Sequence, residues 1–151
     1  MKLCLALLLM AAATVADPFI GLWRLNIAKS NYAPGQCPKA MLIEMMVVGN
    51  GVHYHSETEF TNGRKATSDY SAEYNGAEAM VTGTSGLQTP VSLKRIDANT
   101  VDARYIGALK IVATARRMVS KDGHTMTITT VSADTSGKEV TNSGVYDRVE
   151  R

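Results

Sequence analysis

Short segments in which apolar and polar residues alternate follow one another along most of the chain. In one of them every second residue, from Ala66 to Tyr74, would share one face of an extended strand. Such segments, rich in Val, Ile, Thr, Tyr and Met and bounded by Gly, Asn and Asp, predict β-strands. They cover residues 19–27, 40–48, 52–60, 66–74, 79–84, 89–96, 100–106, 109–120, 124–132 and 139–149.

Most connections between these segments are short. Gly49-Asn50-Gly51, Asn62-Gly63 and Asn75-Gly76 are typical of tight hairpin turns. Residues 28–39 form a longer loop with two prolines, and its start could make one helical turn. Short connections favour antiparallel neighbours. We therefore expect an all-β fold, an antiparallel up-and-down meander β-barrel of about eight to ten strands, because closure removes exposed edges. A two-sheet sandwich is the alternative, although it usually has longer crossovers.

Residues 1–16 have a different pattern and predict a signal peptide before the barrel. Lys2 precedes an apolar run from Leu3 to Ala13, and Thr14-Val15-Ala16 places small residues where cleavage would occur. The run is too short to span a bilayer. We expect one lipocalin-like barrel domain over residues 17–151, secreted or periplasmic, with no stable membrane insertion after signal removal. The alternative is a retained N-terminal anchor.

Composition excludes several classes of partner and chemistry. The 151 residues include 16 Lys and Arg and 14 Asp and Glu, a formal net charge of +2, and these charges interleave along the chain. Without a basic block we expect no nucleic-acid partner. Of the two cysteines, Cys4 lies in the predicted signal peptide. Cys37 is then alone, so the domain must be stable without an internal disulfide.

The first and last predicted strands carry residues that could close one end of a barrel. Trp23 is the only tryptophan, and Gly21 would share its face of the strand. The indole could cover the barrel end, while Gly21 would leave room for a crossing side chain. Arg148, on the last strand, could stack on the indole in a cation–π contact of about 1 kcal/mol. The alternative for Arg148 is a solvated position near the chain end.

These two segments also resemble a known superfamily. Phe19-Ile20-Gly21-Leu22-Trp23-Arg24-Leu25 is similar to the Gly-x-Trp opening of the calycins, especially the Phe-x-Gly-x-Trp-x-Leu opening of fatty-acid-binding proteins. Tyr146-Asp147-Arg148 is similar to the last strand of that group, which has the pattern Arg-x-Tyr followed by x-Arg or x-Lys. The resemblance implies a lipocalin-like or fatty-acid-binding-protein-like barrel in which Gly21, Trp23 and Arg148 are structural.

The chain departs from that family where the family binds its ligand. The Arg-x-Tyr pair of the family holds the ligand carboxylate, but Gly144 stands at the position of that arginine and only Tyr146 is retained. The family also has a helix-turn-helix lid between its first two strands, where this chain has the loop of residues 28–39. A fatty-acid ligand therefore does not follow from the resemblance.

Two neighbouring arginines are the remaining candidates for contact with a ligand. Arg116 and Arg117 lie in one predicted strand, so one faces inward and the other outward. Both faces are semi-apolar, and the pattern does not decide between them. A buried guanidinium needs an anionic partner, for which Glu44 and Asp102 are candidates. We take Arg116, Arg117 and Tyr146 as candidate ligand-binding residues, since the resemblance implies an arginine of this strand in the anchor.

No pattern in the sequence indicates catalysis. There is no phosphate-binding or dinucleotide-binding glycine pattern, and nothing orients His124 toward a nucleophile. His53, His55, Glu57 and Glu59 share one face of a strand, and His-x-His can offer two imidazoles to zinc. A solvated outer face is the simpler interpretation. We expect no enzymatic activity, no cofactor and no metal.

The sequence thus predicts an exported lipocalin-like protein that binds a small hydrophobic ligand non-catalytically in the barrel interior. The alternative is a filled barrel that acts as a protein-interaction or inhibitor module with no small-molecule ligand. The sequence identifies neither the ligand nor a protein partner.

Overall fold

The computed structural model describes residues 15–84 and 86–150, which form an antiparallel sheet and one short 3₁₀ helix. The predicted signal peptide falls almost entirely outside these described residues. Within them no helix is long and apolar enough to cross a bilayer. The helix is η1 (Ile27–Lys29), and the strands are β1 (Gly21–Leu25), β2 (Ala40–Val48), β3 (Gly51–Glu59), β4 (Lys65–Glu73), β5 (Asn75–Ala79), β6 (Thr82–Gly83), β7 (Gly86–Leu87), β8 (Val91–Asp97), β9 (Thr100–Gly107), β10 (Lys110–Val119), β11 (Thr125–Ala133) and β12 (Glu139–Val149).

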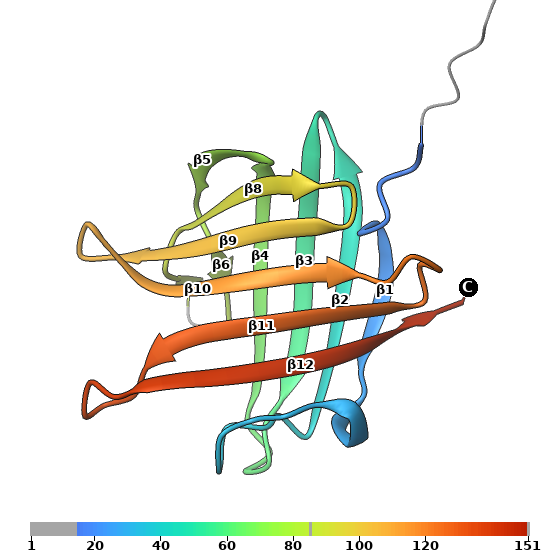
Figure 1. The fold of residues 1–151 in the computed structure, drawn as a ribbon. Coiled ribbons are helices and arrows are strands. Elements are labelled where there is room, and N and C mark those ends of the chain that lie inside the picture. Colours follow the sequence, from blue (N-terminus) through green and yellow to red (C-terminus); the bar gives the residue numbers. More distant parts are fainter. Residues whose placement is uncertain (1–14, 85, 151) are drawn as a thin grey trace, which may run out of the picture.

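The strands form one curled sheet in the order β5-β8-β9-β10-β11-β12-β1-β2-β3-β4-β6-β7. The first and last strands are neighbours, with Trp23 opposite Arg148. Strands β1–β4 cross β8–β12 steeply, so that two layers of the same sheet face each other (Figure 1). This confirms the all-β antiparallel prediction.

The predicted closed meander of about eight to ten strands is wrong in two respects. Among the described residues the sheet has 12 strands, and β5 and β7 stand at the two ends of its hydrogen-bonded order. The difference arises after β4, because β5 pairs with β8 while β6 returns to β4. Gly83 makes this return possible, since a side chain there would collide with the Thr67 backbone carbonyl. The weak alternation of residues 79–84 gave no sign of this division.

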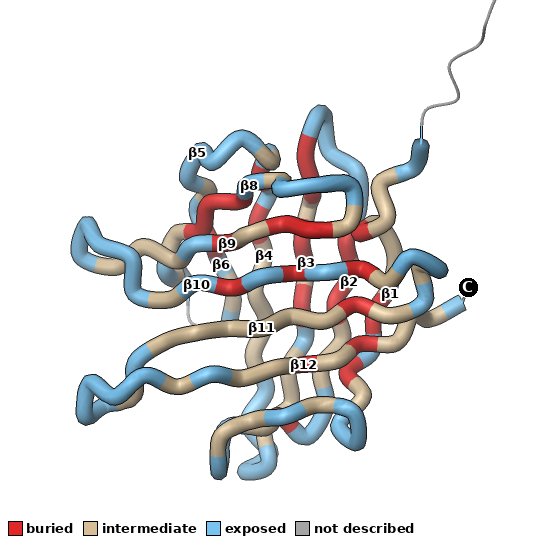
Figure 2. The backbone as a smooth tube through the Cα atoms, viewed as in Figure 1, coloured by how far each residue is buried: buried red, intermediate tan, exposed pale blue. Residues whose placement is uncertain are grey.

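The hydrophobic core fills one end of the curled sheet. Most of its buried segments lie in the centre and right-hand half of the view in Figure 2, and the start of β8 is buried as well. Inward positions farther along the same strands, such as Thr58, Ser68 and Thr130, are only half-buried. The side chains that are almost completely buried are Phe19, Trp23, Ile43, Met45, Val52, Val91, Leu93, Val101 and Met126.

Arg148 closes the filled end. Its Cζ atom lies 4.1 Å from the centre of the Trp23 ring. Its Nε donates to the Gly123 carbonyl at 2.6 Å, its Nη1 to that of Ile20 at 2.7 Å and its Nη2 to that of Pro18 at 2.7 Å. Every nitrogen of this guanidinium therefore has an acceptor, and one side chain joins β12 to the β10–β11 turn and to the segment before β1.

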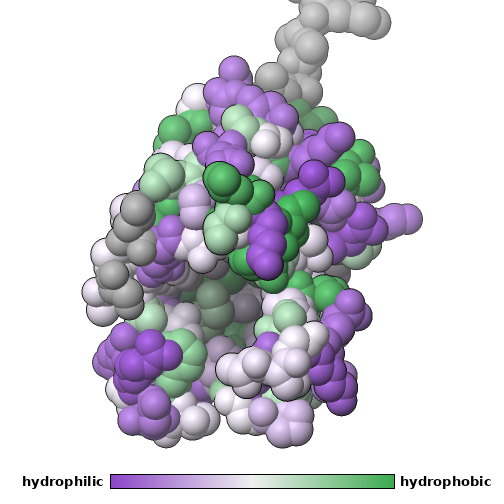
Figure 3. All heavy atoms as spheres, turned by 90° about the vertical axis from the view of Figure 1, so that its left-hand side faces the viewer, coloured by the Kyte–Doolittle hydropathy of each residue, from purple (hydrophilic) through white to green (hydrophobic). Residues whose placement is uncertain are grey.

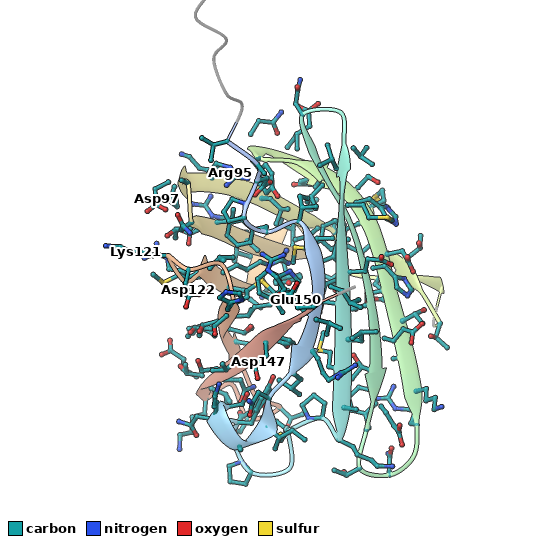
Figure 4. All side chains as sticks on the ribbon, turned by 90° about the vertical axis from the view of Figure 1, so that its right-hand side faces the viewer. Arg95, Asp97, Lys121, Asp122, Asp147 and Glu150 are labelled. Carbon is teal, nitrogen blue, oxygen red and sulfur yellow. The ribbon has the colours of Figure 1, made fainter. Side chains whose placement is uncertain are left out.

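The segment before β1 is bound to the same end by its own side chains. Phe19 is buried, and its carbonyl accepts a hydrogen bond from Trp23 Nε1 at 2.9 Å. The Asp17 carboxylate accepts from Arg95 Nη2 at 2.8 Å and from the Tyr74 hydroxyl at 3.0 Å. Figure 4 shows Arg95 beside this segment. Gly21 has a φ of +142°, and any side chain there would collide with the Arg148 guanidinium.

Candidate interior binding site

The side of the molecule away from the filled end is hollowed (Figure 3). It is the side on which the β9–β10 and β11–β12 turns lie in Figure 1. Half-burial of the inward positions away from Trp23 agrees with this hollow. Apolar and small polar side chains are mixed at these positions. The apolar ones include Met41 and Ile128, and the polar ones include Thr58, Ser68, Thr130 and Asn142.

A cluster of tyrosines lies between the filled end and the hollow. Tyr54 and Tyr70 are opposite each other on β3 and β4, and their rings stack with centres 4.7 Å apart. Both side chains are buried, whereas Tyr105 on β9 is half-buried. The interior of the sheet therefore carries aromatic rings with hydroxyl groups at this level, whereas the aromatic rings at the filled end are those of Trp23 and Phe19.

Arg117 of β10 enters this cluster. Its side chain is 3% exposed, and its Cζ lies 5.1 Å from the centre of the Tyr54 ring and 6.0 Å from that of Tyr70. Arg117 lies opposite Val101, yet its Nη2 reaches the hydroxyl of Tyr105 at 3.5 Å, farther along β9 toward the hollow. The guanidinium thus leans toward the open side of the interior.

The polar groups of this cluster are incompletely paired. Among the described residues, Arg117 Nε and the Tyr70 hydroxyl are buried without a hydrogen-bond partner, and no carboxylate forms a salt bridge with Arg117. A buried ion needs both a counter-charge and hydrogen bonds to offset the loss of hydration. Arg117 has only long contacts to tyrosines in their place.

The electrostatic state of the cluster follows from burial. Burial lowers the pKa of the Arg117 guanidinium, but the hydroxyls of Tyr70, Tyr105 and Tyr54 raise it more, so the net pKa is above its ordinary value. Burial likewise raises the pKa of the Tyr54 and Tyr70 phenols. At neutral pH the interior therefore contains one positive charge surrounded by uncharged hydroxyls, which is an arrangement that attracts an anion.

The register of the sheet decides between the two candidate arginines. Arg117 is opposite Val101, which faces the core, so Arg116 points outward. There Arg116 forms a bidentate pair with Asp102, with Nε to Oδ1 at 2.7 Å and Nη2 to Oδ2 at 2.9 Å. Arg116 is therefore not placed to contact an interior ligand. Asp102, a candidate partner for the buried arginine, is engaged by its exposed neighbour.

Tyr146 faces the interior and is buried, as a ligand-contacting position requires. The glycine two residues before it has a structural reason: a Cβ atom at Gly144 would lie 2.5 Å from the hydroxyl oxygen of Tyr32. Backbone hydrogen bonds of 2.8 and 2.7 Å between Asn31 and Ser143 hold the loop that carries Tyr32. Tyr32 thus occupies the space that a side chain at position 144 would need.

The His53 and His55 strand face lies on the outer surface. His55 Nδ1 is 2.7 Å from Asp69 Oδ1, and this contact with Asp69, aided by Glu57, raises the pKa of the imidazole. In the described part of the chain no group of three or more potential ligands is arranged to hold a metal ion. The contacts of this face are hydrogen bonds across neighbouring strands.

Arg117 and Arg148 both face inward, but only Arg148 has an acceptor for every nitrogen. Replacing each by methionine should therefore change the free energy of unfolding in opposite directions. Arg117→Met removes an unpaired buried charge and should raise the free energy of unfolding by about 1–3 kcal/mol. Arg148→Met leaves three partly buried carbonyls without these donors and removes the contact with the Trp23 ring, so it should lower the free energy of unfolding by about 2–4 kcal/mol. Urea unfolding followed by the fluorescence of Trp23, the single tryptophan, measures both. A loss of stability in Arg117→Met comparable to that in Arg148→Met would contradict this description of the interior.

Comparisons with known proteins bear on the fold. No family model and no curated protein matches the chain. Among solved structures, zebrafish ileal bile acid-binding protein complexed with cholic acid aligns with a TM-score of 0.58 and 12% identity, over 87% of this chain and 99% of that one. Apocrustacyanin C1 aligns at 0.42 and 13%, over 89% and 63%. The first likeness shows that the chain shares the fold of this bile acid-binding protein.

Proposed function

We propose that this chain is an exported binding protein that takes up one amphipathic ligand, with an apolar body and an anionic group, in the hollow of its sheet. The observation that carries the proposal is Arg117, a buried cation whose Nε has no partner among the described residues. The anionic group would lie against this guanidinium. The ligand's apolar body would extend along the half-buried inward positions toward solvent.

The surroundings of Arg117 suit an anion better than a neutral polar group. Tyr70 and Tyr105 present hydroxyl groups next to the guanidinium, and Arg117 supplies the positive charge of the cluster. Hydrogen bonds from a guanidinium to a carboxylate or sulfonate are about twice as strong as those between neutral groups. An anion at this point would also use donors that are otherwise desolvated and unpaired.

The fold comparison supports binding rather than catalysis. The zebrafish protein with the same fold was crystallised with cholic acid, a molecule that combines an apolar body with a carboxyl group. The resemblance implies an anchoring arginine at position 144, but this chain has Gly144 there and Tyr32 fills the adjacent space. Arg117 is then the cation that faces the hollow, and Tyr146 of β12 lies nearby. The chemical class of the ligand is therefore inferred from Arg117 and not from the family.

A matched pair of ligands tests the anionic requirement. Decanoate and decanol share one alkyl chain and differ in charge, and isothermal titration calorimetry should find decanoate bound at least about tenfold more tightly. Arg117→Met should abolish this preference and leave weak binding of both. Arg116→Met, which removes an exposed arginine from the adjacent position, is the control and should retain the preference.

Three results would refute the proposed binding mode. Equal affinities of the wild-type protein for decanoate and decanol would show that the interior does not select charge. A preference that survives Arg117→Met would place the anion elsewhere. Absence of binding by either ligand would favour a filled barrel that interacts only through its surface.

Export is the second part of the proposal, and the contacts of the N-terminal segment support it. Among the described residues Asp17 is the first held by side-chain contacts, while Val15 is 91% exposed and Ala16 is also exposed. Cleavage after Ala16 would therefore leave the contacts of Asp17 in place. Expression of the full chain in a secreting host should release protein whose intact mass begins at Asp17. Retention of residues 1–16 on protein that stays inside the cell would contradict export.

A further inference from the structure

The turn between β9 and β10 is an apolar protrusion. We define residues 106–112 as the apolar tip: apart from glycine, alanine and Lys110 it consists of isoleucine, leucine and valine. Leu109 is 100% exposed, and Ile111 and Val112 are 52% and 42% exposed. Removing such surface from water is favourable, so an exposed set of this kind is typical of a contact site.

The backbone of the tip is also unusual. Ala108 has a φ of 49° and Leu109 a φ of 63°, and they are the only non-glycine residues with positive φ in the described part of the chain. A two-residue hairpin turn with both central residues in this region favours Asn-Gly. The tip therefore combines a conformation that disfavours leucine with full exposure of that leucine, and folding explains neither.

Cationic side chains accompany the tip. From Ala103 to Val119 the chain has four basic residues and no acidic one. Of these, Arg104 and Lys110 are exposed and take part in no salt bridge among the described residues. Glu78 of β5 is an acidic residue near them, lining the same shallow depression. The tip is thus apolar at Leu109, and the exposed basic side chains of Arg104 and Lys110 lie beside it.

The tip stands at the opening of the interior. Figure 3 shows hydrophobic residues gathered beside the mouth of the hollow, over the β9–β10 turn. The β11–β12 turn on the same side is polar, because Asp134 accepts hydrogen bonds from Ser136 and Lys138. Contact through the apolar tip would bring the mouth of the hollow close to whatever the tip touches.

We propose that the apolar tip docks on the surface of an anionic lipid bilayer, with Leu109 among the acyl chains and Arg104 and Lys110 at the headgroups. A narrow convex tip can insert between lipids, whereas a stable protein partner needs roughly 1,200–2,000 Å² of buried interface. Basic residues beside an apolar anchor are attracted to anionic headgroups. The docking is peripheral, and it places the mouth of the hollow where an amphipathic ligand would leave or enter the membrane.

Vesicle cosedimentation tests this docking. The wild-type protein should bind vesicles of phosphatidylcholine with about one quarter phosphatidylglycerol, and bind pure phosphatidylcholine less. The double variant Ala108→Asn, Leu109→Gly supplies the favoured turn residues, so it should fold at least as stably while vesicle binding falls at least about tenfold. Val47→Asn, at a similarly exposed position of the β2–β3 hairpin, is the control and should bind like the wild type.

The proposal extends the interior binding function, but the two fail in different ways. Decanoate affinity should be unchanged in the turn variant, because the tip is not part of the Arg117 cluster. Lys110→Glu should reduce the preference for anionic vesicles. Wild-type protein that stays free of vesicles, whether or not it self-associates, overturns the docking, as does vesicle binding by the turn variant equal to that of the wild type.

Discussion

The contact between the Arg148 guanidinium and the Trp23 indole determines which end of this sheet is closed. It lies where the first and last strands pair, and it ties the chain segment before β1 across the same end. Because glycine at position 21 leaves space for it, the arginine can reach three backbone carbonyls at once. The apolar core packs beneath this contact. On the opposite side the described residues form no equivalent closure, and there the interior is hollow.

Arg148 and Arg117 both place a guanidinium group in the interior, but the two groups differ in how completely they are hydrogen-bonded. Arg148 has an acceptor for every nitrogen and an aromatic ring beneath it, so its burial stabilises the fold. Arg117 has long tyrosine contacts and an unpaired Nε, so its burial has a cost that the folded protein does not offset. This cost is the reason that the proposed function places the anionic group of a ligand against Arg117. Leu109 of the β9–β10 turn is likewise a residue whose exposure and positive φ do not stabilise the fold.

Much of the fold could be predicted from local pattern. Strands β2 and β12 have the predicted bounds, because clear turns flank both. Residues 79–84 were assigned to one strand, yet the chain divides them between β5 and β6, and only the close approach at Gly83 explains why. The alternation of residues could not show which of Arg116 and Arg117 faces inward, because that depends on how β10 pairs with β9. In the structure Arg117 lies opposite Val101, whose side chain is in the core, so Arg117 faces inward.

The candidate site was harder to predict than the fold. Tyr54, Tyr70 and Tyr105 come from three strands, and no spacing along the chain indicates that they surround one guanidinium. The glycine at position 144 was visible in the sequence, but its reason is Tyr32, whose hydroxyl reaches that point from a loop distant in the chain. Tertiary contacts of this kind leave no periodic signal.

Contact between an anionic ligand and the Arg117 side chain inside the sheet can be observed at the Nε–H resonance of Arg117. In the ¹⁵N-labelled protein this resonance is assigned by its loss in Arg117→Met and followed during titration with decanoate and with decanol. If the anionic group binds at Arg117, the resonance should shift strongly with decanoate and change little with decanol. An Nε–H resonance that stays in place while backbone signals report binding of decanoate would contradict binding of the anionic group at Arg117.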